Sequence, residues 1–297
     1  MSNNPILSII IVNWNTANLT VDCIKSIFTD KGLKQLTYEI ILVDNASSDD
    51  SIEKISKLKG PITIIKNKEN VGFGRANNQG IKIAKGNYFL LLNTDTIILH
   101  SAISQSLDWL SSHPESYGCS AQLLNKDKSI QPSGGYFPNI LNMACLLLHL
   151  DDLPFVNKII PPFHPHSPNF YTHDNYYKKD HPQDWLTGAF MLLRREVVEK
   201  VNGFNPKFFM YGEEMEMCYR IHLQYPKMQL WYLVGPQIIH LGGASSKNKQ
   251  IIFDREYLGF NEFFRIHKSN LDQKIIKLLI SINRFLQLIL YKIKNRV

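Results

Sequence analysis

Three ionisable side chains stand at the ends of predicted strands and helices, where parallel sheets place their ligands. Asp95 follows the apolar run Tyr88–Leu92, and His240 closes a short strand before a Gly-Gly turn. Glu214 begins a helix behind an aromatic segment. A carboxylate and an imidazole can hold a divalent cation, and a second carboxylate can take a proton from an attacking hydroxyl group. Together they suit the transfer of a group from a nucleoside diphosphate, whose leaving charge a cation neutralises.

Each of these residues also has a structural interpretation, which the residues alone leave open. Asp95 or Thr96 can cap a helix that starts near Ser101. A lone histidine at a strand end is more often structural than catalytic. Acids in a first helical turn, such as Glu213 and Glu214, often only complement the helix dipole.

Two further residues at strand ends suit the binding of a nucleobase. Asp44 can accept a hydrogen bond from a base edge, and Trp14 offers an aromatic face for stacking. The alternatives are a helix cap for Asp44 and a core position for Trp14. Phosphate-binding fingerprints are missing: Gly72-Phe73-Gly74 lacks the third glycine of G-x-G-x-x-G, and no G-x-x-x-x-G-K-[ST] occurs. The diphosphate is therefore expected to be held by a metal ion and side chains.

The order of strands and helices predicts an α/β fold. Up to residue 96, short apolar runs alternate with helices, which is typical of βαβ units and a central, mostly parallel sheet. The run Tyr88–Leu92 shows no polar alternation, so we expect it to be buried on both faces. The strands expected in this nucleotide-binding half, residues 1–96, are Leu7–Val12, Tyr38–Val43, Ile62–Ile65 and Tyr88–Leu92.

Residues 97–268 are expected to form an acceptor-binding and catalytic half. Residues 132–183 are its least regular part, and a loop this long is normally functional or mobile. The irregular spacing of its histidines favours solvated loop residues over a metal site; they are His164, His166, His173 and His181. The other expected elements are helices 101–111, 195–201, 213–220 and 253–267 and strands 117–124, 129–131, 185–193, 230–234 and 238–240.

The composition is that of a soluble globular protein, with 44% hydrophobic and 20% charged residues among 297. The net charge of +7 suits an anionic partner, which can be a nucleotide, a nucleic acid or a lipid headgroup. The four cysteines are far apart, which favours reduced thiols and the cytosol. The N-terminal residues lack a basic segment before the first strand, so we expect no signal peptide.

Residues 269–297 are predicted to form a basic amphipathic helix. A broad apolar face alternates there with lysine and arginine, as in helices that lie on an anionic bilayer. The alternative is a helix that docks on the protein itself or on a second subunit.

The order of motifs resembles the inverting family 2 glycosyltransferases, particularly the rhamnosyltransferase-like branch of bacterial surface polysaccharide synthesis. The resemblance runs from about Leu7 to Ser246. The matching segments are SIIIVNWN, ILVDNASSDDS, NVGFGRANNQGI, GNYFLLLNTDT, WLTGAFMLLRREV, GFNPKFFMYGEEMEMCYR and IIHLGGASS. The resemblance implies the GT-A fold, in which a nucleotide-binding half precedes an acceptor-binding half.

The resemblance also implies a role for each matching residue. Asn93-Thr94-Asp95 stands at the family's DxD motif with only the final acid kept, so Mg²⁺ or Mn²⁺ would depend on Asp95, with His240 nearby. Glu213-Glu214 stands at the usual Glu-Asp pair, which makes Glu214 the candidate base. Trp185, Gly188 and Ala189 match the wall between donor sugar and acceptor. The donor site would comprise Val12, Trp14, Asp44, Asn70, Arg75, Asn77, Asn93, Thr94 and Asp95.

The expected function is sugar transfer with inversion from dTDP-L-rhamnose, or alternatively a UDP-sugar, to a lipid-linked or other saccharide. The enzyme would work at the inner face of the cell membrane, without nucleic acid and with an oligomer possible. A nucleotidyltransferase would need a glycine-rich, basic loop after the first strand. The segment that stands there, Asn13-Trp14-Asn15-Thr16, contains neither glycine nor lysine. A non-catalytic subunit that binds a sugar nucleotide remains an alternative because the metal motif is reduced.

Overall fold

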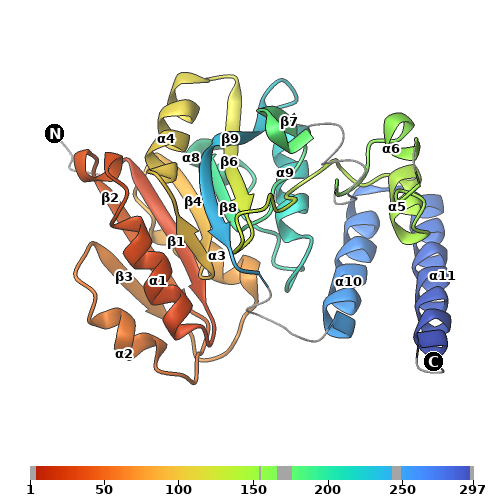
Figure 1. The fold of residues 1–297 in the computed structure, drawn as a ribbon, viewed down its shortest axis with the longest axis horizontal. Helices are drawn as coiled ribbons and strands as arrows, with labels where there is room; N and C mark the ends of the chain where they lie inside the picture. The colour runs from red at the N-terminus through yellow and green to blue at the C-terminus, as the bar shows by residue number, and fades with distance from the viewer. Residues whose placement is uncertain (1–4, 154, 166–175, 243–248, 295–297) are drawn as a thin grey trace.

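The computed structural model describes residues 5–153, 155–165, 176–242 and 249–294 (Figure 1). Its first half contains four parallel strands in the order β3-β2-β1-β4. Helices connect these strands, so the βαβ prediction is confirmed. The elements are β1 (Leu7–Asn13), α1 (Ala17–Ile27), η1 (Gly32–Gln35), β2 (Tyr38–Asp44), α2 (Ser51–Ser56), β3 (Ile62–Lys66), α3 (Phe73–Ile83) and β4 (Tyr88–Asn93).

Strand β4 is buried on both faces, as its unbroken apolar run predicts. Phe89 and Leu91 belong to one hydrophobic core, while Leu90 and Leu92 belong to the other. Alternate residues of a strand point to opposite faces, so each core receives every second side chain. The carboxyl end of β4 is thereby fixed in the middle of the sheet.

The second half continues the same sheet with mixed strand directions. Strand β8 pairs antiparallel with β4 and with β6, and β9 runs parallel to β6. Strands β5 and β7 pair antiparallel with β9. The parallel sheet predicted for the nucleotide-binding half is therefore confirmed, and the second half extends it with strands of both directions. The strands are β5 (Thr96–Ile98), β6 (Ser116–Leu124), β7 (His181–Gln183), β8 (Phe190–Arg194) and β9 (Gln229–His240).

Several expected boundaries differ from the structure. The expected strand 185–193 begins only at Phe190, and the expected strands 230–234 and 238–240 are one strand, β9. The expected strand 129–131 is reduced to an isolated bridge between Leu124 and Ile130. The helices of this half are α4 (Ala102–Ser112), α8 (Arg195–Lys200) and α9 (Glu213–Gln224).

The irregular region 132–183 contains α5 (Ile140–Leu147), α6 (Val156–Ile159) and η2 (Tyr176–Lys178). A capping box formed by Asn139 and Asn142 starts α5. His166 and His173 lie outside the described residues. Within the described ranges, no group of three His, Cys, Asp or Glu side chains is arranged to hold a metal ion.

The chain ends in two long helices, α10 (Lys249–His267) and α11 (Asn270–Lys294). Helix α11 packs against α5 and α10, and the three lie side by side at the end of the molecule away from β3 (Figure 1). Ile276, Leu279 and Ile280 are buried there. In the part of the chain that the structure describes, no helix combines the length and apolarity needed to cross a bilayer.

Candidate active site

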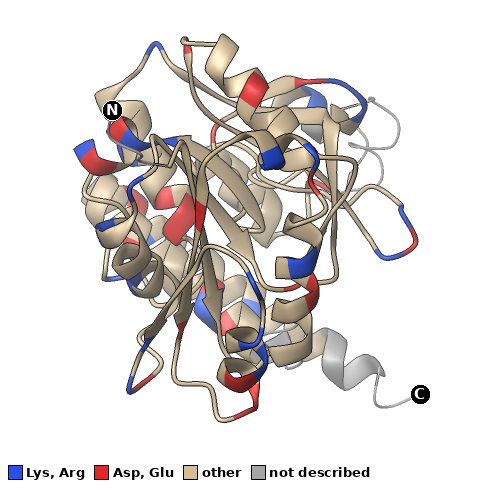
Figure 2. Cartoon of the chain, turned by 90° about the vertical axis from the view of Figure 1, so that its left-hand side faces the viewer, with Lys and Arg blue, Asp and Glu red and all other residues tan. Residues whose placement is uncertain are grey.

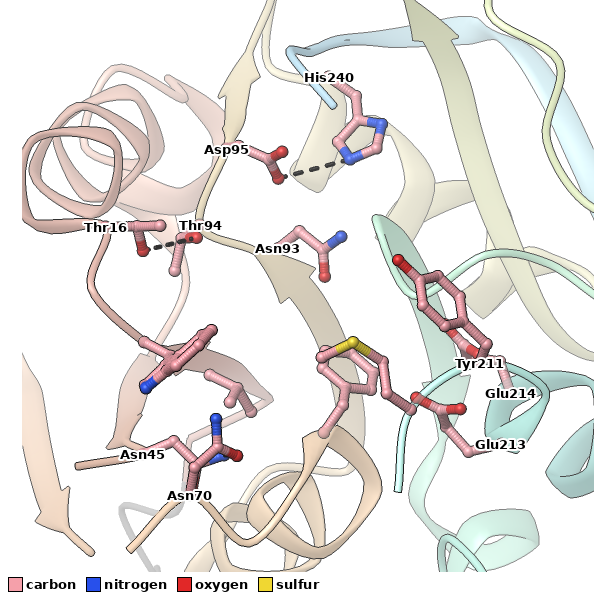
Figure 3. Close-up of a pocket in the computed structure, with 14 residues that line it drawn as sticks. Thr16, Asn45, Asn70, Asn93, Thr94, Asp95, Tyr211, Glu213, Glu214 and His240 are labelled. Atoms are coloured by element: carbon pink, nitrogen blue, oxygen red, sulfur yellow. Dashed lines mark hydrogen bonds and ion pairs between the residues drawn. The ribbon is translucent and has the colours of Figure 1, made fainter. Parts of the chain in front are cut away.

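A cavity of about 260 Å³ opens at the carboxyl ends of β1 and β4 and reaches across to α9 (Figure 3). Residues predicted for donor, metal and base sites meet in it, including Asp95 and Glu214. The predicted residues that line it are Val12, Trp14, Asn70, Asn93, Thr94, Asp95, Glu213, Glu214 and His240. Sequence reasoning missed Thr16, Asn45, Phe73, Met210 and Tyr211.

Asp95 and His240 form a pair at one side of the cavity. Strand β5 pairs antiparallel with β9, which sets Thr96 opposite His240, and the Leu241 amide donates to the Asp95 carbonyl over 2.9 Å. Asp95 Oδ1 lies 3.4 Å from His240 Nε2. Burial alone would raise the pKa of Asp95, but the hydrogen bond and charge of His240 and the Gly242 amide lower it.

The chemistry of this pair fits a divalent cation. A carboxylate oxygen and an imidazole nitrogen face each other, and both residues line the cavity. Two protein ligands are few, but Mg²⁺ is commonly bound through one or two carboxylates together with substrate phosphates. Asp95 and His240 are therefore the residues that would hold such an ion.

Neither Asp95 nor Thr96 caps the following helix, so that alternative is wrong. Asp30 has this role: its Oδ2 accepts from the Ile103 and Ser104 amides at 3.0 and 3.1 Å. Thr96 instead closes the turn after β4 by donating its hydroxyl to the Asn93 carbonyl over 2.8 Å. The carboxylate of Asp95 is thereby left to face the cavity.

Glu213 and Glu214 enter the cavity from the first turn of α9 (Figure 3). Glu214 Oε1 accepts a hydrogen bond from the Gly188 amide at 3.1 Å. Burial raises the pKa of Glu214, and burial together with the charge of Glu214 raises the pKa of Glu213 much further. Glu213 Oε2 is buried without a hydrogen-bond partner among the described residues. Burial therefore favours the protonated form of Glu213, and Glu214, whose carboxylate accepts from the Gly188 amide, is the candidate base.

Gly188 lies too close to Glu214 for any larger residue. A Cβ at this position would be 2.9 Å from Glu214 Oε1 and 2.9 Å from Phe73 Cζ. Gly188 does not line the cavity itself, so its predicted role in the wall is indirect. It holds the carboxylate of Glu214 through its amide.

The opposite wall carries neutral polar groups and one aromatic ring. Trp14 is 39% exposed at the cavity, so the alternative of a core position is wrong. Asn45 Nδ2 donates to Asn70 Oδ1 over 2.8 Å, and Thr16 Oγ1 donates to Thr94 Oγ1 over 3.1 Å. The first bond ties the loop after β2 to the loop after β3, and the second ties the loop after β1 to the end of β4.

Three predicted donor-site residues lie outside the cavity lining. Asp44 is buried, and its carboxylate accepts from Asn13 Nδ2 at 2.7 Å and from the Ser47 amide at 3.1 Å. Arg75 is exposed and donates to the Pro206 carbonyl, while Asn77 is buried in α3 and donates to the Phe73 carbonyl. Their contacts with a donor stay a prediction.

Two predicted acceptor-wall residues are likewise buried beside the cavity rather than in it. Trp185 stacks on Phe163 with ring centroids 5.1 Å apart. The Ala189 carbonyl accepts from the Asn93 amide at 3.3 Å, which ties the segment before β8 to the end of β4. Ala189 thereby supports Asn93, which lines the cavity.

Comparison with known proteins identifies the family of this chain. Residues 8–201 match the model of the family described as glycosyl transferase family 2. The chain belongs to this family.

Curated glycosyltransferases are similar to this chain at low identity. An N-acetylglucosaminyl-diphospho-decaprenol L-rhamnosyltransferase from Mycobacterium tuberculosis (strain ATCC 25618 / H37Rv) is 23% identical over 195 residues, 61% of this chain. Rhamnosyltransferase WbbL from Escherichia coli (strain K12) is 27% identical over 177 residues, 57% of this chain. Each match spans 60% of the relative's own length.

Solved glycosyltransferase structures share the GT-A fold of this chain. A mannosyltransferase from Pyrobaculum calidifontis in complex with GDP-Man and Mn²⁺ aligns with a TM-score of 0.57 and 13% identity. That alignment covers 94% of this chain and 68% of the mannosyltransferase. GalNAc-T7 with UDP, GalNAc and Mn²⁺ aligns with a TM-score of 0.60 and 14% identity, covering 89% of this chain and 50% of that one.

Proposed function

We propose that this family 2 member is an inverting glycosyltransferase whose base is Glu214. The supporting observation is the shared cavity: Asp95 and His240 approach from the ends of β4 and β9, and Glu214 approaches from α9 (Figure 3). Residues 1–96 would bind the nucleotide donor, and residues 97–268 would bind the acceptor.

The reaction is a single in-line displacement. Glu214 accepts the proton of the acceptor hydroxyl, whose oxygen forms a bond to the anomeric carbon as the bond to the diphosphate oxygen breaks. The diphosphate leaves with the electron pair, and the configuration at the anomeric carbon inverts. A divalent cation, Mg²⁺ or Mn²⁺, would neutralise the charge of the leaving diphosphate when bound by Asp95 and His240.

Relatives suggest the substrates. The mycobacterial relative and Escherichia coli WbbL are named as rhamnosyltransferases, so dTDP-L-rhamnose is the proposed donor. Another relative, from Escherichia coli, is named UDP-Glc:alpha-D-GlcNAc-diphosphoundecaprenol beta-1,3-glucosyltransferase WfaP, which keeps a UDP-sugar as the alternative. Both the mycobacterial name and the WfaP name contain an N-acetylglucosaminyl-diphospho-polyprenol. We propose an acceptor of this lipid-linked class, in surface polysaccharide synthesis.

Replacement of Glu214 by Gln separates an enzyme from a non-catalytic binding subunit. Turnover is measured as nucleoside diphosphate release from dTDP-L-rhamnose or UDP-glucose with an N-acetylglucosaminyl-diphospho-polyprenol. Glu214→Gln should lower turnover by roughly 10²- to 10⁴-fold, the usual contribution of general-base catalysis. The rise in melting temperature that the donor produces should be unchanged, because Gln retains the shape of the side chain.

Exposed Glu115, at the far end of β6 from the cavity, supplies the matched control Glu115→Gln. A Glu214→Gln protein with wild-type turnover would refute the assignment of the base. A wild-type protein that binds the sugar nucleotide but never turns over would favour the binding subunit.

We also propose that the C-terminal end of the protein binds the inner face of the membrane. Residues 269–297 hold six Lys and Arg and one Asp, so they account for five of the seven net positive charges. On the side of the molecule that faces the viewer in Figure 2, by contrast, acidic and basic residues are interspersed. A basic segment of this kind suits anionic lipid headgroups.

Exposed apolar side chains gather in the same part of the fold. Of the nineteen large apolar side chains exposed in the described residues, six lie in α11 and five in residues 141–159, around the α5 that packs on it. Phe285 is 63% exposed and Phe155 is 69% exposed. Helix α11 thus docks on the protein with one face, the alternative considered from the sequence, and keeps a second apolar face for lipid.

Point substitutions test this proposal better than truncation, which would also remove the buried side chains of α11. The double variant Leu278→Ser, Phe285→Ser should lose most cosedimentation with phosphatidylglycerol vesicles. Exposed Ile83 and Leu223 lie elsewhere, so Ile83→Ser, Leu223→Ser is the matched control. Equal cosedimentation of all three proteins would refute the membrane surface.

A further inference from the structure

Gln131 holds the ring of His240 from the side that faces away from Asp95. Gln131 Oε1 lies 2.6 Å from His240 Nδ1. Gln131 Nε2 donates to the His240 carbonyl over 3.2 Å and to Asn125 Oδ1 over 2.9 Å. One side-chain amide therefore bonds both the backbone and the imidazole of the same histidine.

These contacts determine which nitrogen of His240 carries the proton. A backbone carbonyl can only accept a hydrogen bond, so the amide nitrogen of Gln131 must face the His240 carbonyl. The amide oxygen then faces Nδ1, and Nδ1 must be the donor. The neutral ring consequently has its lone pair on Nε2, the atom that lies 3.4 Å from Asp95 Oδ1.

The position of Gln131 is built into the sheet. Its backbone amide donates to the Leu123 carbonyl over 2.8 Å, at the end of β6. Within β6 and β9, Leu124 pairs with Ile239, so the chain that leaves β6 runs beside His240. A turn closed by the Asn125 amide and the Ser129 carbonyl, 2.8 Å apart, returns the chain to place Gln131.

We propose that Gln131 is a positioning residue that keeps the Nε2 lone pair of His240 directed toward Asp95, where the two hold a divalent cation. The proposal rests on the cation site of the proposed function. In the neutral ring Nε2 is unprotonated beside the carboxylate, which suits a shared cation, whereas in the doubly protonated ring Nε2 would donate to Asp95, the contact that lowers the pKa of that carboxyl group. Partners that fix the tautomer of a ligating histidine typically change metal affinity by roughly 10- to 100-fold when they are removed.

Nitrogen-15 NMR of the histidine side chains tests the tautomer without any metal or substrate. The His240 signals are assigned by their loss in His240→Asn, at a pH where the ring is neutral. We expect Nδ1–H in the wild type and in Gln131→Glu, which keeps an acceptor. Gln131→Met, similar in length without an oxygen, should shift the ring toward Nε2–H. If His240 of Gln131→Met kept its proton on Nδ1, as in the wild type, the proposal would be overturned.

Electron paramagnetic resonance of free Mn²⁺ in the presence of dTDP then measures the consequence for binding. Gln131→Met should weaken Mn²⁺ binding roughly 10- to 100-fold, and Gln131→Glu should remain close to the wild type. Gln105, exposed on α4, supplies the control Gln105→Met, and thermal unfolding verifies that each variant is folded.

The two possible failures differ. A wild-type protein that binds no Mn²⁺ with dTDP would remove the cation from the proposed function, and this inference with it. A wild-type protein that binds Mn²⁺ while Gln131→Met binds it equally well would overturn the role of Gln131 alone.

Discussion

Along the nucleotide-binding wall of the cavity, amide and hydroxyl side chains bond to one another, whereas along the α9 wall one carboxyl group is buried and another is half-buried, with few partners. Asn45 shows the first pattern: its amide donates to Asn70 and accepts from Asn67 and from the Val71 backbone. Glu213 shows the second, with a buried oxygen that has no partner in the described structure.

The difference indicates how each wall contributes to function. Satisfied neutral groups form a rigid surface that can bind a donor without rearrangement, because their hydrogen bonds are already made. Buried carboxyl groups are costly, and they persist in folds mainly where chemistry needs a shifted pKa. We therefore expect substitutions on the first wall to change donor affinity and substitutions on the second to change turnover.

Asp95→Asn should have the largest effect of the substitutions on the nucleotide wall, because Asp95 is the one carboxylate that the described residues place on that side of the cavity. Loss of its charge would remove the site of the cation and its compensation of the leaving diphosphate. We expect kcat/KM to fall by roughly 10²- to 10³-fold, the cost of one electrostatic contact at a transition state. Asp108→Asn, an exposed change on α4, should have no effect. Turnover of the wild type and of both variants is measured as a function of Mn²⁺ concentration. The turnover of Asp95→Asn should no longer depend on Mn²⁺, and a dependence equal to that of the wild type would contradict the role of Asp95 in holding the ion.

The next largest effect is expected for Gly188→Ala, which tests the α9 wall alone. The added methyl would meet Glu214 Oε1 and Phe73, so the carboxylate would have to move. A displacement of this size should lower kcat by roughly tenfold or more while donor affinity changes little. Gly235→Ala is a matched control, since a Cβ at Gly235 meets no atom within 4 Å. Equal kcat for the two variants would show that Glu214 needs no precise placement.

Asn45→Ala tests the nucleotide wall. The change removes four hydrogen bonds between the loops after β2 and β3, so Asn70 loses a fixed support. We expect roughly tenfold weaker donor binding by calorimetry, about the value of one net hydrogen bond, with kcat at saturating donor unchanged. Asn18→Ala, exposed on α1, is the control. A drop in kcat with intact affinity would erase the distinction between the two walls.

The sequence predicted the parts of the site that local patterns encode. Strand β4 was predicted from an apolar run that both cores require, and Asp95, His240 and Glu214 stand directly at the ends of elements. Thr16 and Asn45 were missed because polar loop residues carry no periodicity. The pairing of Gln131 with His240, 109 residues apart, depends on the register of β6 and β9.

Strand β9 shows why some boundaries could not be predicted. Gly235-Pro236 is a typical break signal, yet the strand continues through it. The register with β6 shifts between Ser120 and Gln122, where Tyr232 and then Gln237 are the partners. Pro236 lies in this bulge, where its missing N–H removes no regular ladder bond. That a proline is tolerated inside β9 is evident only from the pairing of this strand with β6.

The smallest expected effect is on stability, and it should differ in sign between two glutamates of α9. Burial raises the pKa of Glu213, so the folded protein loses stability as pH rises above the ordinary carboxyl range. For Glu216, burial alone would raise the pKa, but hydrogen bonds and charge from His267 and Arg220 lower it. Glu216 therefore contributes stability at neutral pH that is lost as pH falls through its folded pKa.

Thermal unfolding between about pH 4 and pH 7 compares Glu213→Gln with Glu216→Gln against the wild type. At neutral pH, Glu213→Gln should raise the melting temperature and Glu216→Gln should lower it, each by roughly 2–4 °C, as expected for about 1 kcal/mol in a chain of this size. The Glu213 difference should disappear toward acid pH, where its carboxyl group is protonated in both states, and the Glu216 difference should shrink as pH falls from the ordinary carboxyl range toward its lowered folded pKa. If the melting temperatures of Glu213→Gln and of the wild type differed by the same amount at every pH, ionisation of Glu213 would carry no cost in the folded protein. The polar groups of the α9 wall would then be as well compensated as those of the nucleotide wall.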